Sequence, residues 1–144
     1  MKKIEIVNVE IFNTSVAVCI GINKEDLDIL KEDNPNKIDD DIYKQLLKDI
    51  EDETICSGFA TTLKDGTYLM FIREGFENNY SVVNHELFHI TNFILYDRSV
   101  YYERTAETFA YLIGWLSEQY FNIVNSNEED NLNEQLELKF VDSW

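Results

Sequence analysis

The residues His85-Glu86-Leu87-Phe88-His89 have the types and the spacing of a zinc-dependent peptidase site. Residues four apart on an α-helix lie on the same face, so the two imidazoles can converge on one metal ion. Glu86 lies beside them and can act as general base toward a zinc-bound water without being a ligand itself. These are the only two histidines among the 144 residues, so the motif uses every imidazole in the chain.

The sequence around the motif predicts a buried helix between Tyr80 and Tyr96. Most positions are apolar, no proline or glycine interrupts them, and Asn79 or Ser81 could provide the N-cap. Because histidines and a carboxylate buried in such a helix are costly without partners, we expect a metal ion to satisfy them. A chance match on an ordinary helix is the less favoured interpretation.

A catalytic zinc ion needs a third protein ligand, which must here be a carboxylate or a thiolate because both histidines are used. A second apolar helix, expected at about residues 101–121, offers Glu107 inside an apolar stretch, where a carboxylate needs a partner. Glu103, one turn earlier on the same face, is the alternative ligand, and Asp97 or a cysteine thiol remain as further options. An ion pair with an arginine, or simple exposure, would explain Glu107 without a metal.

Two segments together resemble a known kind of enzyme. Residues 84–89, followed by Glu107-Thr108-Phe109-Ala110-Tyr111, are similar to the small zinc metallopeptidases of phages and prophages, which pair H-E-x-x-H with a downstream E-x-x-A-Y. The pattern is more distantly similar to the ImmA/IrrE-type peptidases. The resemblance covers about residues 80–120, and it implies a catalytic type and not a substrate.

The resemblance also assigns roles to residues. It implies a minimal gluzincin-like fold in which His85, His89 and Glu107 are the zinc ligands and Glu86 is the base. An alignment one turn earlier stays open, because Glu103 also begins an E-x-x-A sequence.

Hydrolysis would need a group that assists zinc in stabilising the oxyanion, and no histidine is left for this. Tyr111 is our candidate, because it lies one turn beyond Glu107 on the same helical face. Other tyrosines and arginines near the motif are alternatives: Tyr80, Tyr101, Tyr102, Arg73 and Arg104. For each of these residues, aromatic packing or a surface charge is the simpler interpretation.

The elements that must position the motif indicate an α+β domain. The expected strands are at 4–12, 15–22, 55–63 and 67–73, the last two joined by Lys64-Asp65-Gly66, and two acidic helices broken near 34–36 fill residues 23–53. We expect a minimal zincin-like domain: a small, mostly antiparallel sheet, with helices on one side, packed against the motif helix and the second ligand-bearing helix.

An exposed sheet edge could pair with a peptide backbone. Residues 1–125 would form this single domain, and 126–144 an acidic C-terminal tail with a short helix or strand at 136–141.

Composition limits the partners. The formal charge of −16, from 28 acidic and 12 basic residues, opposes nucleic-acid binding, and the basic residues are scattered. Solubility is the simplest reason for the acidity, and attraction of a basic partner or substrate is the other. No run approaches the ~20 apolar residues of a membrane helix. The early Glu5, with no signal cleavage site, predicts a cytoplasmic protein in which Cys19 and Cys56 are reduced.

Three functions compete. The leading hypothesis is a zinc-dependent metallopeptidase that hydrolyses a peptide or protein. The alternative is a zincin-fold module that binds zinc and a protein partner without hydrolysis, and the third is a structural domain without metal. The presence of Glu86 favours the enzyme, because a purely structural zinc site does not need a base.

Overall fold

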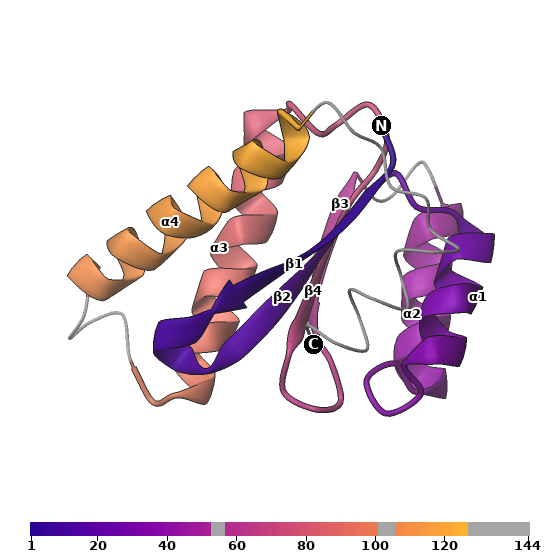
Figure 1. The fold of residues 1–144 in the computed structure, drawn as a ribbon, viewed down its shortest axis with the longest axis horizontal. Coiled ribbons are helices and arrows are strands. Elements are labelled where there is room, and N and C mark those ends of the chain that lie inside the picture. Colours follow the sequence, from indigo (N-terminus) through magenta and orange to yellow (C-terminus); the bar gives the residue numbers. More distant parts are fainter. Residues whose placement is uncertain (53–56, 101–105, 127–144) are drawn as a thin grey trace.

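The computed structural model describes residues 1–52, 57–100 and 106–126, and in these ranges one four-stranded sheet lies between two pairs of helices (Figure 1). The predicted α+β class is therefore confirmed. The elements in chain order are β1 (Lys3–Val9), the short 3₁₀ turn η1 (Glu10–Phe12), β2 (Thr14–Ile20), α1 (Lys24–Asp33), α2 (Asp40–Glu51), β3 (Gly58–Thr62), β4 (Tyr68–Ile72), α3 (Tyr80–Asp97) and α4 (Ala106–Val124).

The sheet is mixed, with strand order β1-β2-β4-β3. The outer pairs, β1 with β2 and β3 with β4, are antiparallel as predicted, whereas the central pair, β2 with β4, is parallel. A parallel pair requires a long crossover connection, which here contains α1, α2 and β3. All five residues of β4 are buried, as expected for a central strand covered on both faces.

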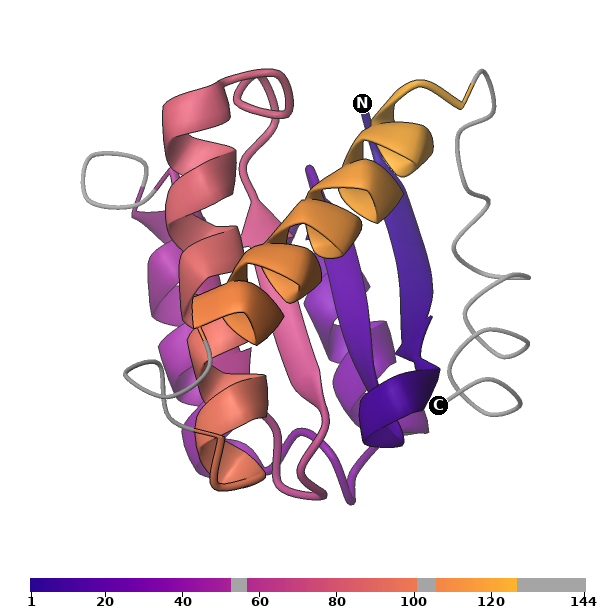
Figure 2. The ribbon, with the colours of Figure 1, turned by 90° about the vertical axis from the view of Figure 1, so that its left-hand side faces the viewer.

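Helices cover both faces of the sheet, so the prediction that they pack on one side is wrong. Val18, Ile20, Met70 and Ile72 belong to one core with α3 and α4. The intervening strand residues, such as Cys19 and Phe71, form a second core with α1 and α2. Because β4 and residues 16–20 of β2 are apolar at every position, each face needs its own helical cover. Figure 2 shows α4 crossing the sheet obliquely, from α3 toward β1.

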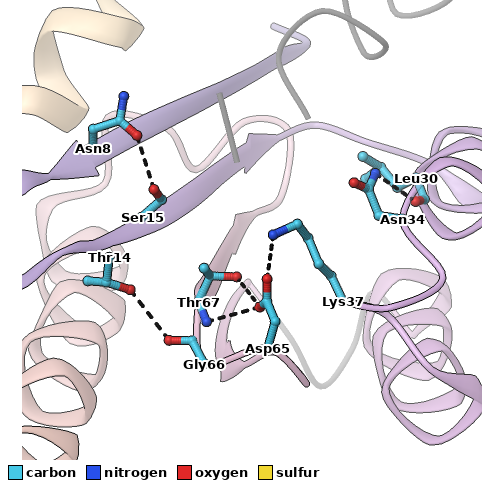
Figure 3. Close-up of polar contacts among 9 residues, drawn as sticks. All are labelled: Asn8, Thr14, Ser15, Leu30, Asn34, Lys37, Asp65, Gly66 and Thr67. Atoms are coloured by element: carbon cyan, nitrogen blue, oxygen red, sulfur yellow. Dashed lines mark hydrogen bonds and ion pairs between the residues drawn. The ribbon is translucent and has the colours of Figure 1, made fainter. Parts of the chain in front are cut away.

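Polar contacts hold the connections at one end of the sheet (Figure 3). The predicted Asp65-Gly66 turn is present, with Gly66 at a positive φ of 84°. The Asp65 carboxylate accepts hydrogen bonds from the Thr67 amide at 3.1 Å and the Thr67 hydroxyl at 2.6 Å. Lys37, between α1 and α2, forms an ion pair with Asp65. The predicted break between two helices and the predicted hairpin are therefore both confirmed, and one ion pair joins them.

Some predictions fall on undescribed residues. The expected second long helix is present as α4, but residues 101–105, which precede it, lie outside the described residues. So do Cys56, residues 127–144 of the predicted tail and the element expected at 136–141. Cys19 is buried in β2. Of the helices that are described, none combines the length and the apolar character needed to cross a membrane.

Candidate metal centre

Helix α3 brings the two histidines of the motif together. The Asn79 side chain accepts a hydrogen bond from the Val82 amide at 3.2 Å, which confirms the predicted N-cap and sets the start of the helix. The Nε2 atoms of His85 and His89 then lie 3.1 Å apart. Two nitrogens bound tetrahedrally to one zinc ion at ~2.0–2.1 Å would be separated by roughly 3.3 Å. The pair is therefore already near the spacing that a zinc ion requires.

Glu86 completes a group of three side chains. Its Oε1 atom lies 3.7 Å from His85 Nε2. The potential ligand atoms of His85, Glu86 and His89 all lie within 4.8 Å of one another, and this is the one such group in the described parts of the chain. The predicted motif residues thus converge in space as well as in sequence.

The three side chains differ in burial, and the prediction of buried histidines is wrong for His85. The His85 side chain is 68% exposed, whereas that of Glu86 is 7% exposed, and His89 is half-buried. The core face of α3 is formed by residues such as Val83, Ile90 and Ile94, and His85 lies on the solvent side of this face. The burial argument for a metal therefore applies to the Glu86 carboxylate and in part to His89, while the exposed imidazole of His85 leaves the site open to ions and substrates.

Glu86 is a buried acid with an unused oxygen. Within the described part of the chain, its Oε2 atom has no hydrogen-bond partner. Burial raises the pKa of Glu86, a nearby charge on His85 lowers it, and Asp49 raises it. A buried acceptor without a partner costs about 1–3 kcal/mol. Such a group suits a site where it must receive a proton from a water molecule.

His89 favours the neutral form that binds metals. Burial lowers its pKa, and the charge on His85 lowers that pKa further. Metal ions bind the deprotonated imidazole nitrogen, so this shift favours coordination at neutral pH. Without a metal, the 3.1 Å separation would allow one ring to donate a hydrogen bond to the other.

A glycine in the edge strand makes room for Glu86. A Cβ atom added to Gly58 would lie 2.9 Å from Glu86 Cγ and 3.1 Å from Val82 Cγ1. The same two elements, β3 and α3, line a pocket of about 260 Å³ with Ser57, Gly58, Ser81, Val82, His85 and Glu86. Sequence reasoning missed Gly58, although a glycine inside a predicted strand, here 55–63, is a sign of close backbone approach.

Substitution of Gly58 by alanine should disturb both the fold and the site. The added methyl group must displace Glu86 or separate β3 from α3, and overpacking of this kind costs about 1–3 kcal/mol. We expect a lower free energy of unfolding in urea titrations. Gly114→Ala is the matched control, because no atom lies within 4 Å of its added Cβ and the helical position favours alanine. Equal effects of both substitutions would contradict the close packing described for Gly58.

Glu107 lies away from the core side of its helix. It is exposed in the first turn of α4, and nine residues along the helix place it about half a turn from the buried Leu116. It is not part of the three-residue group on α3. Glu103 lies outside the described residues. The choice of either glutamate as third ligand stays a prediction. Asp97, the further option for the third ligand, lies about two turns beyond His89 on α3. Its carboxylate accepts a hydrogen bond from the Tyr68 hydroxyl at 2.5 Å.

Of the candidates for oxyanion stabilisation, Tyr111, Arg73 and Tyr80 are described, and none of the three lines the pocket at the motif. Tyr111 is exposed and lines a groove against residues 8–12, and it does not line the pocket at the motif. Arg73 donates hydrogen bonds to the backbone carbonyls at the end of α2. Tyr80 is exposed at the start of α3. Tyr101, Tyr102 and Arg104 lie outside the described residues. The role of Tyr111 stays a prediction.

Comparisons with protein-family models, with curated protein sequences and with solved structures find no match. The resemblance to phage and prophage metallopeptidases, and the zincin-like form of the fold, therefore stay predictions. The function must be argued from the site itself.

Proposed function

We propose that this chain is a zinc-dependent metallopeptidase, with zinc held by His85, His89 and a glutamate, either Glu107 or Glu103. The observation that carries the proposal is the convergence of two imidazole Nε2 atoms beside a buried carboxylate whose Oε2 has no described partner. Two histidines and one carboxylate are a ligand set of catalytic zinc. Zinc, when bound, supplies Lewis-acid polarisation and lowers the pKa of water.

Glu86 is the group that moves protons in this proposal. Its Oε2 atom retains lone pairs for a hydrogen bond from water, because no other described group uses them. Burial raises the pKa of Glu86, which brings it closer to the working pH of a general base. The carboxylate can take a proton from the attacking water and then deliver it to the leaving amine.

The edge strand β3 would hold the substrate backbone. The Leu63 amide donates a hydrogen bond to the Thr67 carbonyl, and the Arg73 amide donates one to the Ser57 carbonyl. These bonds show which residues of the β3 segment direct their backbone groups toward β4, because such residues alternate along an antiparallel pair. The backbone N–H and C=O groups of Ala60 and Thr62 consequently point away from β4, at the outer edge of the sheet. Strand β3, which forms this edge, contacts α3. An extended peptide added there would run beside the histidine pair.

The second candidate function is a module that binds zinc and a protein partner without hydrolysis. The small size of the pocket at the motif favours it, because about 260 Å³ lies below the usual range of enzyme pockets. Such a module would use His85 and His89 in the same way, with Glu86 as a bystander.

Cleavage of a peptide library separates the two functions. We expect the zinc-loaded protein to cleave a subset of the library, with new termini detected by mass spectrometry. A chelator should abolish cleavage, and added zinc should restore it. A protein that holds zinc but cleaves no library member would contradict the peptidase and support the binding module.

A further inference from the structure

A second concave site lies between η1 and α4. It is a groove of about 570 Å³, which is within the size range of binding pockets, and it is lined by Asn8, Val9, Glu10, Ile11, Phe12, Thr108, Tyr111, Leu112 and Trp115. Ile11 is 84% exposed, Tyr111 is 78% exposed and Trp115 is 38% exposed. Exposed apolar side chains that gather at one concavity are typical of an interaction site.

Acidic side chains surround these apolar residues. Glu10 is part of one wall and is exposed. On α4, the exposed Glu118 lies two turns after Tyr111, on the same helical face. The segments 8–12 and 108–115, which supply the two walls, contain no lysine or arginine. One wall therefore contains a carboxylate, the other has a carboxylate beside it, and neither contains a basic residue.

Arg98 also approaches this region, and its side chain is turned inward. Arg98 donates hydrogen bonds to the Phe12 carbonyl at 2.8 Å and to the Tyr68 hydroxyl at 3.1 Å. A third hydrogen bond goes to the Ile94 carbonyl at the end of α3. Because these bonds from Nε and Nη1 hold η1 against α3 and β4, Arg98 helps to fix the shape of the groove.

We propose that this groove binds a segment of a partner protein in which a large apolar side chain is flanked by lysine or arginine. The apolar side chain would contact Ile11 and Trp115, and the cation would lie against an aromatic ring and a carboxylate. Lysine and arginine side chains are stabilised both by a carboxylate and by an aromatic ring, and tryptophan and tyrosine rings are the strongest partners in cation–π contacts. Charge steers association and selects the partner, while the apolar contact supplies most of the affinity.

Charge also argues against two other occupants of the groove, a second copy of the chain and the segment 127–144. A second copy of the chain would carry the same net charge of −16 and would be repelled. The segment 127–144 of the chain itself contains six acidic residues and one lysine. Only a basic partner complements the carboxylates at the two walls.

The groove does not depend on the metal centre. None of its lining residues is Glu86 or a proposed zinc ligand, and Tyr111, which was predicted to assist hydrolysis, lines this groove and not the pocket at the motif. Binding should therefore be unchanged in the presence of a chelator, so a failure of the proposed peptidase function would leave this inference standing.

The test is fluorescence anisotropy of a labelled peptide that alternates lysine with leucine, measured on the full chain with a chelator present. We expect Trp115→Ala and Ile11→Ala, one from each wall, to weaken the Kd at least about tenfold. Glu10→Lys should weaken binding at low salt and much less at high salt. Tyr80→Ala is the control, since Tyr80 is an exposed aromatic residue outside the groove and should leave the Kd within about twofold.

Three results would overturn the proposal. Equal binding by Trp115→Ala, Ile11→Ala and the wild-type chain would show that the peptide follows net charge alone. Displacement of the labelled peptide by a synthetic peptide of residues 127–144 would assign the groove to the chain itself. A dimer in light scattering that Trp115→Ala dissociates would assign it to a second copy.

Discussion

Replacement of Glu86 by glutamine is expected to lower the rate of peptide hydrolysis by about 10²–10⁴-fold while zinc stays bound. The amide keeps the shape of the side chain in its tight place against Gly58 but cannot take a proton from water. Zinc binding should persist because the proposed ligands are the histidines and a glutamate other than Glu86. The measurements are kcat/KM on a cleaved library peptide and the zinc content of the same sample.

The Glu86→Gln experiment has a folding check and a matched control. Burial raises the pKa of Glu86, so removal of the charge should maintain or increase the thermal stability of the metal-free protein at neutral pH. Glu32→Gln, at an exposed position of α1, should change neither rate nor stability. Loss of zinc from Glu86→Gln would make Glu86 a ligand, and an unchanged rate would remove it from the chemistry.

Replacement of His89 by alanine is expected to weaken zinc binding by more than about 100-fold. Even groups that only orient a metal ligand are worth about 10–100-fold, and His89 would supply a ligand atom itself. Its Nε2 is one of the two atoms that converge at 3.1 Å, so His85 alone cannot chelate. The measurement is competition for zinc against a chromophoric chelator, with hydrolysis followed in parallel.

Asn92 provides the control for the His89 variant. It is an exposed residue on the same helix, three positions further along, and Asn92→Ala should bind zinc like the wild-type chain. Wild-type affinity in His89→Ala would contradict the histidine pair as the core of the site. Equal losses in both variants would indicate damage to α3.

Local signals in the sequence predicted much of this molecule. Asn79 was predictable as the N-cap of α3 because its side chain can accept a hydrogen bond from the first turn. The Asp65-Gly66 turn was predictable because glycine adopts a positive φ readily. The convergence of His85 and His89 follows from the helical repeat alone.

Features that depend on distant parts of the chain were not predictable. The parallel pairing of β2 with β4 joins segments separated by two helices and a strand, and no local pattern encodes it. The contact of Gly58 with Glu86 arises only when β3 packs on α3. The exposure of His85 depends on which side of an apolar helix meets the sheet, and a helix apolar on most sides does not reveal this.

The third ligand illustrates the same limit. Glu107 was chosen because it lies in an apolar stretch, but only the packing of α4 shows that it lies opposite the buried Leu116. Short-range patterns identify a helix and its polar residues, whereas the direction in which a residue points depends on the partner of the helix.

Zinc titration of the metal-free wild-type chain by calorimetry tests the central claim most directly. The proposed site predicts one zinc ion bound per chain, with protons released as the imidazoles coordinate. A chain that shows no saturable zinc binding under these conditions would contradict the metal centre, and with it the proposed peptidase.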